Sequence, residues 1–179
     1  MGSIDLTKLE HDARGRYERS RVRLAIACGL PVLLVVAAAL LFARHASSVA
    51  LFGGALFVTG VVLLWRGQAA GRAFWPGVVS GLLPLVLSLV ANQTHGCASG
   101  HCASWCVPAC AAGGVGAGLF IAALATRWKV GASFWVGASL MAVLTGSMGC
   151  SCVGASGVFA LIIGHAAGVS TLFIRRLRG

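Results

Sequence analysis

Six apolar stretches, each long enough for a helix that crosses a membrane, most constrain how this chain can fold. A helix needs roughly 20 apolar residues to cross the hydrocarbon core of a bilayer. We predict spans at residues 24–43, 47–65, 73–92, 106–126, 131–149 and 153–174. Composition agrees, because only 10% of the residues are charged, whereas a water-soluble domain carries about a quarter. The sequence therefore predicts an all-α, polytopic integral membrane protein: a bundle of six transmembrane helices over residues 24–174.

The basic residues alternate along the chain in a way that predicts orientation. Lysine and arginine are enriched in the short cytoplasmic loops of membrane proteins. Of the 14 present, all except Arg44 lie in the N-terminal arm, in the second and fourth connections, or in the tail at residues 175–179. Both termini are therefore predicted to be cytoplasmic, in a multi-pass protein of the bacterial inner membrane.

Residues 1–23 form a polar, basic arm ahead of the first span. Apolar residues recur in it at three- and four-residue spacing, which predicts a helix with one mildly apolar stripe. Its arginines would contact anionic lipid headgroups in the bilayer. The alternative is a docking helix for a cytoplasmic partner. The candidate residues of that partner-binding surface are Leu6, Leu9, Tyr17, Arg14 and Arg16.

Small-residue spacings predict where helices approach one another. Gly77-x-x-x-Gly81, Gly114-x-x-x-Gly118 and Gly164-x-x-x-Gly168 lie in the third, fourth and sixth spans. Such spacings let helix backbones approach closely in membranes. The two connections that flank the fifth span are so short that the helices they join must be antiparallel neighbours.

Thiols and imidazoles gather in the third and fifth connections and the ends of the adjoining spans, which the predicted orientation places outside the cytoplasm. Of the 7 cysteines, all except Cys28 lie there. The candidate metal or redox residues are Cys97, Cys102, Cys106, Cys110, Cys150, Cys152, His95 and His101. Cys28 lies near the inner end of the first span and is expected to be a small packing residue.

Three interpretations of these cysteines remain open. They could form structural disulfides outside the cytoplasm, and a bridge from the 97–110 cluster to Cys150 or Cys152 would hold the last four helices together. They could bind zinc, copper(I) or another thiophilic metal ion with His95 or His101. They could also act as a sensor, in which oxidation or metal capture changes helix packing and the arm reports it. A bridge between Cys150 and Cys152 is disfavoured by geometry.

His165 is a second candidate site, because an ionisable residue near the middle of a span is a functional hypothesis by default. The alternative is a neutral histidine bonded to a Ser or Thr on a neighbouring helix. No carboxylate follows Glu18, so acid–base pairs and catalytic triads are excluded, and we expect no enzyme. The basic residues lie in small groups at span ends, so direct nucleic-acid binding is not expected either.

The layout resembles the six-helix transmembrane anti-sigma factors of the NrsF type and the CarR-like membrane regulators of myxobacteria. The closest stretch is Leu144-Thr-Gly-Ser-Met-Gly149-Cys150, then His165, then Arg175-Arg176. The resemblance implies an arm that holds a cytoplasmic sigma factor at the membrane and releases it after an envelope signal. Cys150 best corresponds to the family's sensing thiol.

Two functions are therefore predicted from the sequence. The first is a regulatory or sensory membrane protein, an anti-sigma factor by resemblance, that responds to metal or oxidant through an outer Cys/His cap. The alternative is a small membrane carrier or scavenger of thiophilic metal ions, with the cysteines otherwise in structural disulfides.

Overall fold

The computed structural model describes residues 6–42, 46–95, 102–151 and 154–178, with side chains over a smaller part of these ranges. The elements there are all helices. They are α1 Leu6–Phe42, α2 Ala46–Arg66, α3 Gln68–Arg72, α4 Phe74–His95, α5 Cys102–Trp128, α6 Ala132–Cys150 and α7 Ala155–Arg178. The all-α prediction is confirmed for the described part of the chain. The short helix α3 occupies the second predicted connection, and the predicted tail continues α7 as far as Arg178.

Five helices in the described ranges are long and apolar enough to cross a membrane, judged by length and composition. They are Arg14–Leu41, Ala46–Arg66, Ala70–Asn92, Trp105–Trp128 and Ala132–Cys150. Each overlaps one of the first five predicted spans. The sixth predicted span falls on α7, where the described apolar part is the shorter Ala155–Thr171. A sixth crossing therefore stays a prediction.

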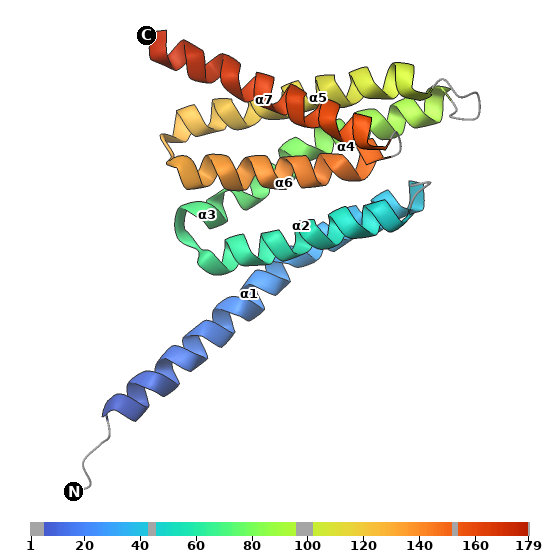
Figure 1. The fold of residues 1–179 in the computed structure, drawn as a ribbon. Coiled ribbons are helices and arrows are strands. Elements are labelled where there is room, and N and C mark those ends of the chain that lie inside the picture. The colour runs from blue at the N-terminus through green and yellow to red at the C-terminus, as the bar shows by residue number, and fades with distance from the viewer. Residues whose placement is uncertain (1–5, 43–45, 96–101, 152–153, 179) are drawn as a thin grey trace, which may run out of the picture.

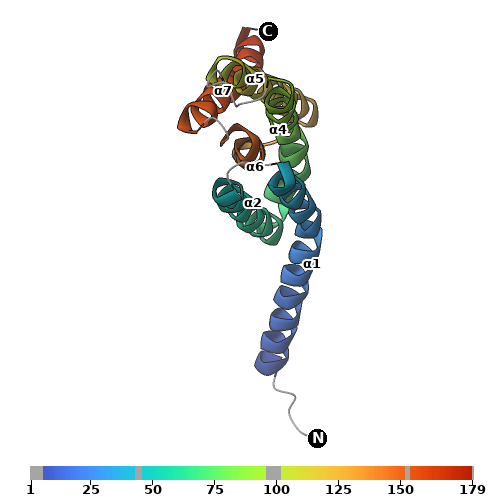
Figure 2. The same cartoon turned by 90° about the vertical axis from the view of Figure 1, so that its right-hand side faces the viewer.

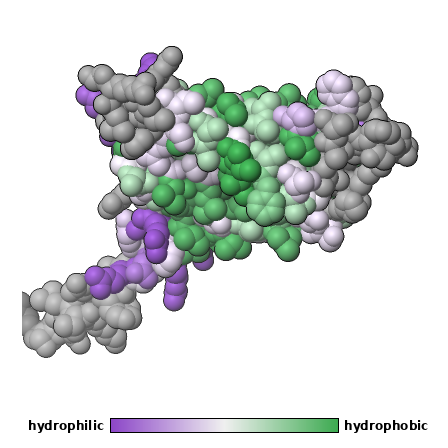
Figure 3. All heavy atoms as spheres, turned by 45° about the horizontal axis from the view of Figure 1, so that its top comes forward, coloured by the Kyte–Doolittle hydropathy of each residue, from purple (hydrophilic) through white to green (hydrophobic). Residues whose placement is uncertain are grey.

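Apolar side chains cover the outside of the bundle. Figure 3 shows hydrophobic side chains over the middle of the visible face and hydrophilic ones where α1 leaves the bundle. Leu34, Leu41 and Ile163 are exposed over 73%, 83% and 68% of their surface. A water-soluble monomer rarely exposes a continuous apolar area of this kind, whereas lipid tails cover it without loss. The surface is that of a membrane protein.

Helix α1 joins the polar arm to the first span without a break. The predicted boundary between arm and span, after residue 23, falls inside this helix, which runs from Leu6 to Phe42. No proline lies near that boundary, so nothing stops the helix of the arm from continuing into the apolar stretch. Figures 1 and 2 show its N-terminal half projecting away from the other helices. At roughly 1.5 Å per residue, arm and span form a single helix of roughly 55 Å.

Helix α6 lies at the centre of the bundle, as Figure 2 shows, and contacts α2, α4, α5 and α7. Met141, near the middle of α6, is fully buried with Phe74 of α4 and Leu56 of α2 in the main hydrophobic cluster. A second cluster joins α6 to α5 through Phe134 and Ile121. A displacement of α6 would therefore change the packing of most helices in the bundle.

Glycines bring the helices together as two parallel pairs. Figure 1 shows α4 and α6 running in one direction and α5 and α7 in the other. A methyl group added at Gly77 or Gly81 of α4 would lie 2.7 Å from the carbonyl oxygen of Ala138 or Ala142 of α6. The predicted close approach is thus confirmed for this pair.

The pair α5 and α7 is closer still. A methyl group at Gly114 or Gly118 would collide with the backbone of α7 at Leu161 or His165. Reciprocally, Gly164 and Gly168 of α7 lie against the backbone of α5. The consecutive helices α5, α6 and α7 do contact one another, as predicted, but the most extensive contacts are α5–α7 and α4–α6. The glycine faces, which the chain connectivity does not reveal, decide this pairing.

Candidate functional site

Three of the predicted thiol residues meet at one end of the bundle. Cys106 and Cys110 lie in the first turns of α5, and Cys150 is the last residue of α6. We call this the cysteine end, defined by Cys106, Cys110 and Cys150. Figure 1 shows that it lies opposite the end where α1 begins and α7 finishes, which we call the arm end.

The other predicted metal or redox residues cannot be placed relative to these three. Cys97, His101 and Cys152 lie outside the described residues. His95 ends α4 and Cys102 begins α5, but the side chains of both lie outside the described part. Their proposed metal or redox roles stay predictions.

A disulfide joins α5 to α6 at the cysteine end. Cys110 and Cys150 are paired with a Cα–Cα distance of 6.0 Å across a sequence separation of 40, within the range usual for disulfides. Both are fully buried and pack against Leu161 of α7. The bridge is one that the structural-disulfide interpretation allowed, from the 97–110 cluster to the 150–152 pair. It joins α5 to α6, and α7 packs against it through Leu161.

Cys106 lies one helical turn from the bridge and is a free thiol. Only 2% of its surface is exposed, so a reagent reaches it only when this end of the bundle opens. Next to it, Trp105 is 62% exposed. A buried thiol beside a buried disulfide can take part in thiol–disulfide exchange once a thiolate forms.

The described residues do not by themselves build a metal centre. No group of three or more Cys, His, Asp or Glu side chains lies close enough to hold a metal ion within the ranges described. In the paired state the sulfurs of Cys110 and Cys150 are bonded to each other and are not thiolate ligands. Metal binding at this end would require reduction of the bridge or the thiols outside the described part.

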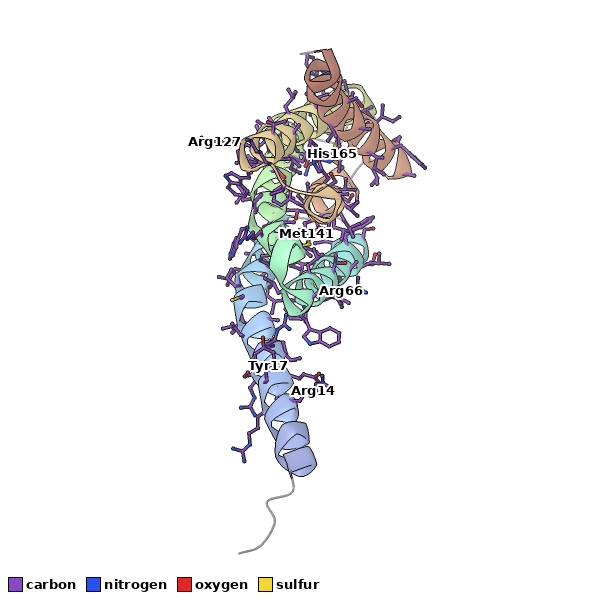
Figure 4. All side chains as sticks on the ribbon, turned by 90° about the vertical axis from the view of Figure 1, so that its left-hand side faces the viewer. Arg14, Tyr17, Arg66, Arg127, Met141 and His165 are labelled. Atoms are coloured by element: carbon purple, nitrogen blue, oxygen red, sulfur yellow. A yellow bond between two sulfur atoms is a disulfide. The ribbon has the colours of Figure 1, made fainter. Side chains whose placement is uncertain are left out.

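His165 is buried at the α5–α7 contact. It is 6% exposed, and Figure 4 shows it on α7 close to α5 and α6. Its Nε2 atom has no hydrogen-bond partner among the described residues, and the same is true of Ser147 Oγ on α6. One of the two expectations was a neutral histidine bonded to a Ser or Thr of a neighbouring helix, and within that part of the structure Nε2 forms no such bond.

The arm carries exposed partner candidates and one contact with the bundle. Arg14, Arg16 and Tyr17 are all exposed, Tyr17 by 62%, and Figure 4 shows Arg14 and Tyr17 on the projecting part of α1. The side chains of Leu6 and Leu9 lie outside the described part, although both residues are in the helix.

The contact between arm and bundle was not predicted from the sequence. Arg21 donates a hydrogen bond of 2.7 Å from Nη2 to the carbonyl oxygen of Trp65, at the end of α2. The guanidinium also lies 5.6 Å from the centre of the Tyr17 ring, within cation–π range. Gly67 follows α2 with a positive φ of 66°, and a methyl group there would lie 2.5 Å from Arg21 Nη2. The sequence signal was the Trp65-Arg-Gly67 helix end, whose last carbonyls need a donor.

No protein-family model, curated protein or solved structure matches this chain. The resemblance to anti-sigma factors of the NrsF type therefore remains a prediction from the residues that carry it. The features that a function must explain are a buried disulfide at one end of the helical bundle and a projecting helix at the other.

Proposed function

We propose that this protein is a sensor in the bacterial inner membrane, with the cysteine end outside the cytoplasm and the arm end inside it. An oxidant or a thiophilic metal ion such as zinc or copper(I) acts on the outer thiols. The resulting change in helix packing alters what α1 presents to a cytoplasmic partner. By the resemblance stated above, that partner is a sigma factor of the extracytoplasmic-function class, and the protein is its anti-sigma factor.

The orientation is supported by charge. The basic residues of the arm end are the arm arginines, Arg66 and Arg72 at the ends of α2 and α3, Arg127 in the last turn of α5, and Lys129 directly after it. Basic residues of short loops stay on the cytoplasmic side. With six crossings, both termini lie in the cytoplasm and the thiols face a compartment where disulfides persist.

The observation that carries the proposal is the position of the Cys110–Cys150 bridge. It fixes the outer end of α6, the central helix, to α5. Helix α6 packs against α2, and α2 holds Arg21 of α1 at its inner end. One bond at the cysteine end is thus connected to the arm through two helix contacts. Oxidation of the two thiols transfers two electrons to the oxidant and releases two protons, forms the S–S bond and fixes the end of α6 to α5.

Thiol accessibility in intact cells tests the site and its orientation. A membrane-impermeant maleimide is applied with and without reductant, and labelled positions are mapped by peptide mass spectrometry. The expected result is labelling of Cys110 and Cys150 only after reduction, and of Cys28 only after permeabilisation. Labelling of Cys28 in intact cells, with the other two protected, would show the opposite orientation and overturn the proposal.

A photo-cross-linking amino acid at Tyr17 tests the output. The expected result is a cross-link to a sigma factor whose yield differs between oxidised and reduced cells, and the difference is lost in Cys150→Ser. If the cross-link yield is the same in oxidised and reduced cells, the bridge is purely structural.

The competing carrier function is distinguished by deleting residues 1–13, which leaves the apolar span Arg14–Leu41 intact. A carrier would keep its metal uptake or resistance without these residues.

A further inference from the structure

We propose that one face of α1 is a binding site for an anionic phospholipid, and that three of the five arm arginines form it. The face consists of Arg16, Arg19, Ser20 and Arg23, and we call it the arginine face. These residues line a hollow of about 640 Å³ together with Leu24 and Ala27. All of its described lining comes from this single helix.

Helix geometry separates the arginine face from the rest of the arm. The spacing 16, 19, 20 and 23 places these side chains in one stripe, since residues three and four apart are neighbours on a helix. Arg21 lies on another side, where it is bonded to Trp65. Glu18, the one acidic side chain that the structure describes, lies about 160° round the helix from Arg16 at about 100° per residue. Among the side chains that the structure describes, the stripe therefore carries positive charge and no carboxylate.

The ligand class follows from the two ends of the hollow. Three guanidinium groups at the polar end match phosphate oxygens, which arginine binds in a bidentate manner. At the other end Leu24 is 67% exposed and begins the apolar part of the span. A free phosphate would satisfy the arginines and leave Leu24 uncovered. A phospholipid with a negatively charged headgroup fills both parts, with its phosphate on the arginines and the first carbons of its chain on Leu24 and Ala27.

The site goes beyond the proposed sensor, because it needs only that α1 crosses a bilayer and not that the cysteines sense anything. It also separates two roles within the arm. Arg21 faces the bundle, the arginine face meets the lipid, and Arg14 lies about 160° round the helix from Arg16, on the side of Arg21. The angle at which α1 leaves the bundle would then depend on headgroup charge.

Native mass spectrometry of the full chain in a neutral detergent tests the site. The probes are phosphatidylglycerol, phosphatidylcholine with the same acyl chains, and glycerol phosphate as the soluble phosphate. The expected result is retention of phosphatidylglycerol over phosphatidylcholine. The double variant Arg16→Gln and Arg19→Gln should weaken that retention about thirtyfold, since each basic residue near an anionic surface contributes about 1 kcal/mol and about 1.4 kcal/mol is a factor of ten. The matched control is Arg127→Gln with Lys129→Gln, which removes two charges at the same end of the bundle and should leave retention unchanged.

Three results would overturn the proposal. Equal loss in the control would show that binding follows net charge and not the arginine face. Equal retention of both lipids would show an apolar contact without headgroup recognition. Displacement of phosphatidylglycerol by an equal concentration of glycerol phosphate would assign the arginines to a soluble phosphate. All four substituted residues are exposed, so glutamine is tolerated there, and circular dichroism checks that the helices persist.

Discussion

At the scale of single residues, the glycines of the parallel helix pairs are the positions where one added methyl group has the clearest effect. They divide into those that face a neighbouring backbone and those that face open space. Gly118 and Gly168 meet the backbone of the partner helix, while Gly54 of α2 has nothing within 4 Å of an added Cβ. A backbone cannot rotate away as a side chain can, so the two classes should respond differently to the same substitution.

Gly118→Ala or Gly168→Ala should therefore lower the stability of the bundle by about 1–3 kcal/mol, because α5 and α7 must separate to admit the methyl group. Gly54→Ala is the matched control and should be neutral or stabilising by up to about 1 kcal/mol, through its better helix propensity. Unfolding in mixed micelles with increasing SDS measures both. Equal behaviour of the two variants would mean that α5 and α7 are not in backbone contact.

His165 allows a prediction that separates packing from function. Its buried Nε2 has no described partner, and an unpaired buried polar atom destabilises a fold by about 1–3 kcal/mol. His165→Leu should therefore leave the SDS unfolding midpoint unchanged or raise it. If the redox-dependent cross-link from Tyr17 disappears in this stable variant, the histidine serves the output and not the fold. A fall in stability would instead reveal a hydrogen-bond partner for Nε2 in the bilayer.

At the scale of helices, sequence reasoning succeeded where a property is local. Apolar length placed the first five spans on observed helices, and the spacing of Gly77 and Gly81 identified a real contact face. It failed where the outcome depends on which helix surfaces pack against each other. The spacing of the cysteines could not select Cys110 as the partner of Cys150, because that choice depends on how deep each helix end sits. The boundary between arm and span at residue 23 stays a prediction, because it marks a change in polarity that falls inside the continuous helix α1.

The link between α1 and α2 gives a prediction at this scale. Arg21→Gln removes the guanidinium that donates to the Trp65 carbonyl, a partly exposed contact worth about 0.5–1 kcal/mol. Global stability should hardly change, whereas the angle between α1 and the bundle should vary more widely. Fluorescence energy transfer between unnatural amino acids at Arg14 and Arg72 would record a broader distance distribution. Arg19→Gln, on the arginine face, is the control in detergent and should leave the distribution as it is.

At the scale of the whole molecule, the Cys110–Cys150 bridge limits the conformational freedom of the unfolded chain. It closes a loop with a sequence separation of 40, for which the chain-entropy model gives about 4 kcal/mol. Cys110→Ser should lower the free energy of unfolding by about 2–4 kcal/mol without reductant. The wild-type protein with reductant should fall to a similar value, and Cys28→Ala should change little. If reductant leaves the wild-type stability unaffected, the bridge does not form in the membrane.

The two parallel pairs also have a consequence for how such a chain is made. In a chain inserted helix by helix, consecutive helices are antiparallel, so parallel partners always have another helix between them. The α4–α6 contact becomes possible only after α5 has been inserted, and the bridge between Cys110 and Cys150 only after α6. The α5–α7 contact comes last, and until then Gly114 and Gly118 face lipid. Synthesis that stops before α7 thus yields an intermediate in which the glycine face of α5 lacks its partner helix.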